Sequence, residues 1–96
     1  MAKPVIWHPE AKEDFRETVA YLMDAWPADV AEKFAAQVDK AQELIEQHPG
    51  IGMKVGRLRA VRKVAVPPHH ALYYTVLGEE IWILNLLDQR QNPQAI

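Results

Sequence analysis

Residues 56–74, "GRLRAVRKVAVPPHHALYY", gather side chains that bind anions and transfer protons. The stretch holds three arginines, one lysine, two adjacent histidines and two tyrosines, and no acidic residue. Arginine and lysine stabilise the charge that develops on a phosphate under attack, and a histidine exchanges protons near neutral pH. The same cations attract the carboxylates of a partner protein. The stretch therefore predicts a site for phosphates or for an acidic polypeptide.

This basic stretch belongs to a longer asymmetry of charge that the formal net charge of −2 hides. Residues 10–48 carry ten acids and four bases, whereas residues 49–78 carry no acid. The five bases of the second segment are Lys54, Arg57, Arg59, Arg62 and Lys63. If the fold keeps the two segments apart, one surface is acidic and another is basic. A plainer alternative is that these bases pair with acids of residues 28–48, in surface pairs that contribute only about 0–1 kcal/mol each.

Hydrophobic periodicity predicts the elements that must position these side chains. Residues 3–7, rich in β-branched and aromatic side chains, are typical of a strand. Residues 8–26 place apolar side chains every three to four positions and predict a helix, which Pro27 ends. Residues 28–48 repeat the helical spacing until "HPGIG" stops it. Because the link at Pro27 is short, we expect two antiparallel helices, a helical hairpin.

Beyond the helices the periodicity changes to two, which indicates strands. Residues 61–66 and 70–77 alternate between two faces, and residues 80–87 are apolar almost throughout, as expected of a central strand. Gly78 and Glu79 suit a two-residue hairpin loop between the last two strands. We expect these three strands to form an antiparallel meander, with the first strand at one edge or beside the last one.

The predicted fold is a two-layer α+β domain of order β-α-α-β-β-β, in which the helical hairpin covers one face of an antiparallel sheet. A chain of 96 residues has room for one core, so residues 1–96 are predicted to be a single domain. Trp7, Trp26 and Trp82 are expected in the core between the layers. The uncovered face is expected to gather the cations and one of Tyr73 and Tyr74.

Composition excludes several classes of protein. The chain has no cysteine, which rules out disulfides and cysteine–zinc sites and suits a reducing cytoplasm. The adjacent histidines His69 and His70 point to opposite faces of a strand, and no carboxylate cluster converges on them, so we expect no metal site. No apolar run approaches the length of a membrane span, and no cofactor motif is present. We therefore expect a cytoplasmic protein without cofactor or membrane partner.

Nearly the whole chain resembles the RelE/ParE family of toxins from bacterial type II toxin–antitoxin systems. The resemblance rests on the order and spacing of "WHPEAKEDFRETVAYL", "HPGIGMKVGRLRAVRKVAV", "HHALYYTVLGEEIWILNLL" and "DQRQNP". It implies a RelE/ParE-like fold and a protein that inhibits growth when free, with a role in plasmid stabilisation. It also implies a cognate antitoxin from the same operon, with an acidic, partly disordered tail, and a toxin–antitoxin hetero-oligomer.

The family divides by target, and the resemblance implies different roles in each branch. RelE-like members cleave mRNA within the ribosome through basic, tyrosine or histidine side chains on the open sheet face; here the catalytic set would be His70, Arg62 and Arg90. ParE-like members lack most of that set and inhibit DNA gyrase. This chain has few cations before residues 61–66, and no tyrosine or histidine follows residues 80–87. The ParE-like branch is therefore favoured, acting by binding; a ribosome-dependent mRNA endonuclease and a non-toxic binding or regulatory relative remain alternatives.

Under the binding interpretation, a basic face contacts the target or the antitoxin. The residues predicted for this face are Lys54, Arg57, Arg59, Arg62, Lys63 and Tyr74. Plainer roles compete with these: His70 follows two prolines and suits a turn, and one of Tyr73 and Tyr74 must face the core because strand residues alternate.

Overall fold

The computed structural model describes residues 3–91, except the side chains of Leu58, Arg59 and Gln91. The elements in chain order are β1 (Val5–Trp7), α1 (Pro9–Ala25), α2 (Ala28–Gln47), β2 (Met53–Val55), β3 (Leu58–Val66), β4 (His70–Leu77), β5 (Glu80–Asp88) and the 3₁₀-helix η1 (Gln89–Gln91). The predicted α+β class and the order of helices before the main strands are confirmed. The short strand β2 was not predicted.

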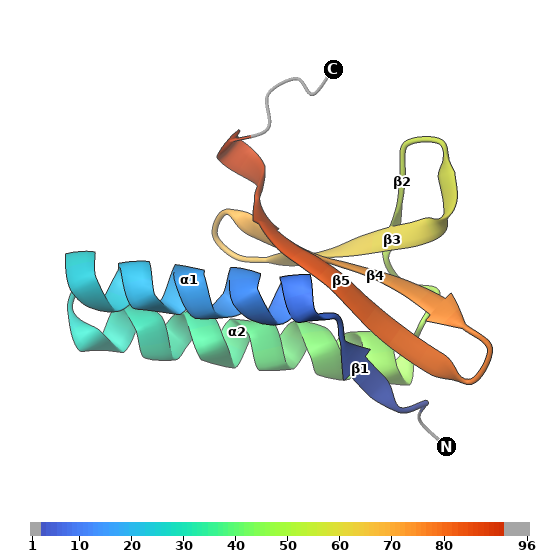
Figure 1. Ribbon diagram of the computed structural model, residues 1–96, viewed down its shortest axis with the longest axis horizontal. Helices are drawn as coiled ribbons and strands as arrows, with labels where there is room; N and C mark the ends of the chain where they lie inside the picture. The colour runs from blue at the N-terminus through green and yellow to red at the C-terminus, as the bar shows by residue number, and fades with distance from the viewer. Residues whose placement is uncertain (1–2, 92–96) are drawn as a thin grey trace.

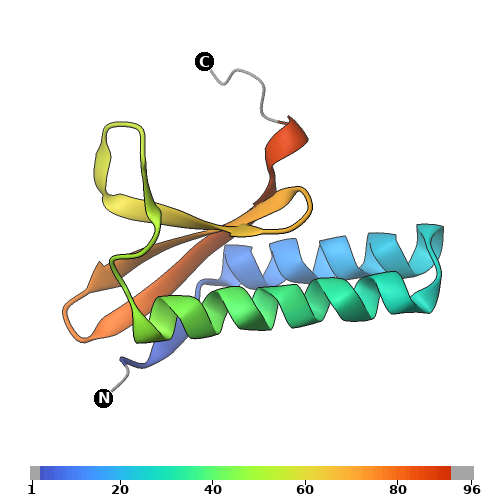
Figure 2. The same ribbon diagram turned by 180° about the vertical axis from the view of Figure 1, so that it is seen from behind.

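The two helices lie side by side on one face of a twisted sheet, as Figures 1 and 2 show from opposite sides. The strand order in the sheet is β1-β5-β4-β3-β2, and α1 lies against β5 while α2 lies against β3. The β2–β3, β3–β4 and β4–β5 pairs are antiparallel. The first strand lies both at an edge and beside the last strand, but parallel to it. The sheet is thus mixed, because no tight turn joins β1 to β5 and forces them antiparallel.

Local sequence explains where the helices begin and end. His8 caps α1, because its Nδ1 accepts the Glu10 N–H at 3.0 Å, and Pro9 follows where a missing N–H costs nothing. Two residues, Trp26 and Pro27, separate the helices. The second helix, α2, buries one apolar stripe against the sheet. The buried residues of α2 are Ala31, Phe34, Val38, Ala41 and Ile45.

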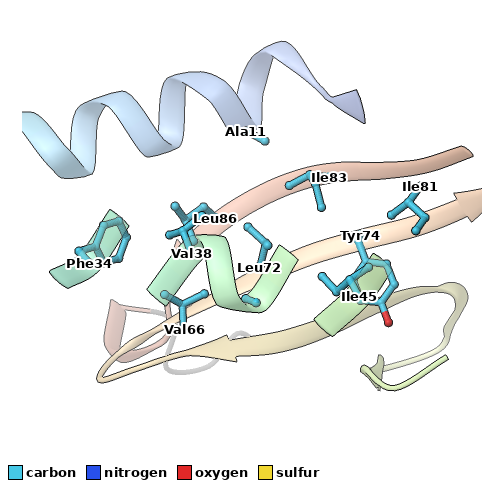
Figure 3. Packing of buried hydrophobic residues seen from close by; sticks show 11 residues of the cluster. Ala11, Phe34, Val38, Ile45, Val66, Leu72, Tyr74, Ile81, Ile83 and Leu86 are labelled. Atoms are coloured by element: carbon cyan, nitrogen blue, oxygen red, sulfur yellow. The ribbon is translucent and has the colours of Figure 1, made fainter. Parts of the chain in front are cut away.

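The core lies between α2, the start of α1 and the inner sheet face, as Figure 3 shows. Leu72, Tyr74, Ile81 and Ile83 are fully buried on the sheet side. The expectation that Trp26 fills the core is wrong: its side chain is 54% exposed, because the tip of the helical hairpin extends beyond the sheet (Figure 1).

Two-residue loops of the same kind join two pairs of neighbouring strands in the sheet. Gly78 and Glu79 join β4 to β5 as predicted, and Gly78 has a φ of 60°, a conformation that glycine adopts without steric cost. Gly56 has a φ of 51° in the loop between β2 and β3. Both loops turn the chain within two residues, so β2 and the start of β3 form an additional β-hairpin that was not predicted.

No helix in the described part of the chain is long and apolar enough to cross a membrane.

Candidate functional site

A groove of about 1010 Å³ lies between the tip of the helical hairpin and the end of the sheet where β3 turns into β4. Aromatic and aliphatic side chains form much of its wall: Tyr21, Leu22, Trp26, Val30, Phe34, Leu86 and Leu87. Charged and polar groups complete the lining: Asp14, Glu17, Lys33, His69, His70, Asp88 and Arg90. The groove is amphipathic because apolar side chains lie beside charged ones. It is not a cationic pocket because its charges are of both signs.

His70 opens β4 and lies half-buried in this groove. Its ring meets that of Phe34 edge to face, with centroids 5.0 Å apart. Burial lowers the pKa of His70, and the Arg90 and His69 charges act in the same direction, while the Asp88 carboxylate opposes them. The imidazole is therefore mostly neutral at pH 7.

Asp88 and Arg90 form a clamp at the end of β5. The Arg90 guanidinium donates to both carboxylate oxygens of Asp88, at 3.2 and 2.8 Å, and the Arg90 backbone N–H donates to Oδ1 at 2.8 Å. The hydrogen bond from the Arg90 side chain lowers the pKa of Asp88 to about 2. Asp88 was not among the predicted site residues. Its spacing two residues before Arg90, directly after an apolar strand, is the sequence signal that could have found it.

Asp14 of α1 fixes the other wall of the groove. Its Oδ2 accepts the backbone N–H of Leu86 at 3.0 Å and the side-chain amide of Asn85 at 3.1 Å. The register of β5 shifts here, since Asn85 pairs with Tyr73 but Ile83 pairs with Tyr74. The carboxylate therefore satisfies a backbone donor at a β-bulge and joins α1 to β5.

The structure brings together two of the three predicted catalytic residues and leaves the third elsewhere. His70 and Arg90 both line the groove. Val66 is the register partner of His70, and Arg62 lies four residues before Val66. Four strand residues span about 13 Å, so Arg62 lies about that far along β3 from His70. Its Nη1 donates to the Gly52 carbonyl at 2.8 Å. His70, Arg62 and Arg90 thus do not converge on one point.

Tyr74 does not lie on an exposed basic face, so this part of the prediction is wrong. Alternation along β4 directs Tyr74 to the helical side with Leu72, where it is fully buried. Its hydroxyl donates to the Pro49 carbonyl at 2.6 Å and accepts the Gly52 N–H at 3.0 Å. Tyr74 therefore fastens the α2–β2 connection to the core.

Lys63 lies on the other face of the sheet with Tyr73, its register partner. The Lys63 Nζ donates to the Gln89 Oε1 at 2.8 Å and lies 5.7 Å from the centre of the Tyr73 ring. The Gln89 amide in turn donates to the Tyr73 hydroxyl at 3.0 Å. These contacts, which include the unpredicted Gln89, hold η1 on the sheet.

Lys54 and Arg57 are exposed on the β2–β3 hairpin. Lys54 is the register partner of Arg62, so the two side chains share one face of the hairpin. The Arg59 side chain lies outside the described residues. Among the side chains that the structure describes, none of Lys54, Arg57 and Arg62 forms an ion pair with α2, and the pairs present involve other cations. The predicted cations therefore lie in separate places: the hairpin, the open sheet face and the groove.

No three histidine, aspartate or glutamate side chains within residues 3–91 are placed to hold a metal ion.

An antiparallel helical hairpin on a sheet of order β1-β5-β4-β3-β2 is shared with bacterial toxins of toxin–antitoxin systems. The structure described as the chromosomal ParDE TA system from P. aeruginosa matches with a TM-score of 0.76 at 17% identity, covering 91% of this chain and 96% of that chain. The YoeB dimer from Staphylococcus aureus matches with a TM-score of 0.63 at 20% identity, covering 88% and 94%. These likenesses define the fold class.

The sequence narrows the class to one family. Toxin ParE1 of Caulobacter vibrioides is 29% identical over 93 residues, which cover 97% of this chain and 96% of that protein. The family model described as "ParE toxin of type II toxin-antitoxin system, parDE" matches residues 5–93, and the chain belongs to this family. The RelE/ParE resemblance is thereby confirmed, and the protein is the toxin of a type II toxin–antitoxin system.

Proposed function

We propose that this toxin inhibits growth by binding DNA gyrase, without cleaving mRNA, and that a cognate antitoxin neutralises it. The observation that carries the proposal is the separation of the cations that a nuclease would need. Cleavage of RNA requires a proton acceptor, a proton donor and fixed positive charge around one phosphate. Here Arg62 lies about 13 Å along β3 from the groove end that holds Arg90, and its guanidinium bonds the Gly52 carbonyl, so the two guanidinium groups do not face one phosphate.

The groove itself also argues against phosphate binding. The Arg90 guanidinium is engaged by both oxygens of Asp88, whose low pKa keeps it charged. A carboxylate in that position repels a phosphate that approaches the same guanidinium. His70 packs on Phe34 and is the remaining candidate base. A neutral histidine beside an arginine that is already paired with a carboxylate suits binding of a protein better than cleavage of RNA.

The antitoxin partner is supported by relatives that are described as complexes. Similar solved structures include the ParDE system from P. aeruginosa and the YoeB–YefM complex from Staphylococcus aureus. We propose the groove as the seat of the antitoxin, since Tyr21 and Trp26 are 62% and 54% exposed at its rim. Disordered partners commonly fold an amphipathic segment into such a groove. The neighbouring reading frame should encode a small protein with a DNA-binding N-terminal half and an acidic, apolar tail.

Two assays on purified toxin separate the gyrase and ribosome targets. We expect the toxin to inhibit supercoiling of relaxed plasmid by DNA gyrase, and the antitoxin to restore it. In parallel, primer extension on mRNA translated in a cell-free system should show no new ends. The His70→Ala variant is the discriminating control: inhibition of gyrase should stay within about twofold of the wild type, because the proposal gives His70 no chemical role. Cleavage at codon boundaries that disappears in His70→Ala would overturn the proposal in favour of the endonuclease.

A further inference from the structure

We propose that the β2–β3 hairpin is the surface that contacts the target, and that it fits an acidic surface of the target protein. The proposal rests on the function proposed above and adds the element that performs the binding. In Figures 1 and 2 this hairpin rises from the sheet on the side away from the helices, so a larger partner can reach it. It lies at the opposite end of β3 from the groove, since the groove includes Pro67 to His70 after β3 has ended.

Two cations in this hairpin oppose each other directly. Lys54 on β2 and Arg62 on β3 are register partners in an antiparallel pair. Side chains in such positions have Cβ atoms about 5 Å apart, and like charges there destabilise the sheet. No acid occurs anywhere in residues 49–78 to compensate, and Arg57 adds a third positive charge in the loop. An arrangement that costs stability in the free protein is relieved when carboxylates of a partner bind between the cations.

The hairpin is held in place by contacts at its base. The buried Tyr74 hydroxyl bonds the backbone of Pro49 and Gly52, and the Arg62 guanidinium bonds the Gly52 carbonyl. Gly52 is itself buried, and a Cβ added there would lie 2.7 Å from the Tyr74 hydroxyl and 2.9 Å from the Arg62 Cβ. Because these contacts fix the base before binding, little entropy is lost when a partner orders the exposed cations.

The partner is inferred to be protein and not nucleic acid on two grounds. The chain as a whole is acidic, and the hairpin offers three described cations, fewer than the roughly six to ten phosphate contacts with which a protein binds DNA in a strongly salt-dependent way. Apolar side chains lie beside the cations: Ile51 is 51% exposed and Met53 is 67% exposed. Exposed methionine and arginine next to each other are typical of protein–protein interfaces.

The test is the charge reversal Lys54→Glu, which exchanges a repulsive cross-strand pair for an attractive one. The melting temperature should rise by about 1–5 °C, because Arg62 gains an opposite charge. The concentration of toxin that half-inhibits gyrase should rise at least about tenfold, because a contact with target carboxylates becomes repulsive. Lys40→Glu, an exposed position on α2, changes the net charge equally and should leave inhibition within about twofold. A more stable toxin that inhibits less cannot be explained by loss of fold.

Each other outcome has a separate meaning. If wild-type toxin does not inhibit gyrase, the proposed function fails, and the inference about the hairpin fails with it. If the wild type inhibits and Lys54→Glu inhibits equally, or Lys40→Glu loses as much, the function stands and the inference alone is wrong. If the toxin alone retards relaxed plasmid in a gel and Lys54→Glu abolishes this, the partner is DNA and the assignment to an acidic protein is overturned. Lys54→Glu should also keep its complex with the antitoxin, because the groove is unchanged.

Discussion

The two ends of β3 are built on different principles. At the groove, beyond Val66, side chains contact side chains: His70 packs on Phe34, and Arg90 clamps Asp88. At the hairpin, before Arg62, side chains hold the backbone: Tyr74 and Arg62 bond the main chain around Gly52. We therefore expect His70 and Arg90 to tolerate substitution without loss of the sheet. The base of the hairpin depends on Gly52, because there is no space for a side chain at that position.

The largest effect is expected at the hairpin end. In Gly52→Ala, the added Cβ would lie 2.7 Å from the Tyr74 hydroxyl and 2.9 Å from the Arg62 Cβ, so one of the two contacts must break. We expect the free energy of unfolding to fall by about 2–3 kcal/mol in urea titrations, as overpacking a buried position does. The matched control is Gly50→Ala, where nothing lies within 4 Å of the new Cβ and the change should stay within about 0.5 kcal/mol. Equal effects at both positions would contradict this account of the hairpin base.

A smaller effect, which depends on pH, is expected at the groove end. Asp88→Asn removes a carboxylate whose folded pKa is about 2, below the ordinary value of 3.8. Its stabilisation is present above pH 3.8 and is lost as the pH falls towards 2. Since the Arg90 side chain is 62% exposed and water screens the pair, we expect the variant to be about 1 kcal/mol less stable at pH 7. The difference should fall to less than half near pH 2.5; a difference that does not change with pH would show that the clamp acts by geometry and not by charge.

The smallest effect concerns His70. Its lowered pKa means that the folded protein disfavours the protonated imidazole, so stability should be highest above pH 6.5 and decrease as the pH falls below it. His70→Phe retains a ring against Phe34 and should lack this part of the pH dependence. The measurement is the difference in unfolding free energy between the two proteins from pH 7.5 to 5.5, together with the NMR titration of the His70 ring. A titration midpoint above 6.5 would mean that Asp88 outweighs burial.

The sequence predicted both helices and the three long strands because the signals for these elements are local. Pro27 and the apolar stripes defined both helices, and Gly78 with Glu79 defined the last turn. The β2–β3 hairpin was missed although Gly56 and Arg57 repeat the pattern of Gly78 and Glu79, because β2 has only three residues and no alternation to detect. Short strands depend on their partner for stability and leave little periodicity.

The site was harder to predict, because position along the chain does not fix which cations meet. Strand alternation puts Arg62 and Lys63 on opposite faces of β3, so the single basic face predicted for both could not hold them together. The choice between Tyr73 and Tyr74 depended on which face the helices cover. The contact between Arg62 and Gly52 and the clamp between Arg90 and Asp88 depend on loop geometry. Such contacts decide whether a basic side chain is free to act, and no sequence pattern reveals them.

If the antitoxin binds in the groove as proposed, the bond from the Leu86 amide to Asp14 limits how the two proteins can evolve together. Because the carboxylate ties α1 to the last strand, the groove cannot widen by a shift of the helix without exposing an unpaired amide. New pairing specificities should therefore arise through exchange of individual lining side chains, such as Tyr21 or Trp26, on an unchanged backbone. Related toxins in one genome would then differ in which antitoxin they bind while their main chains remain superimposable.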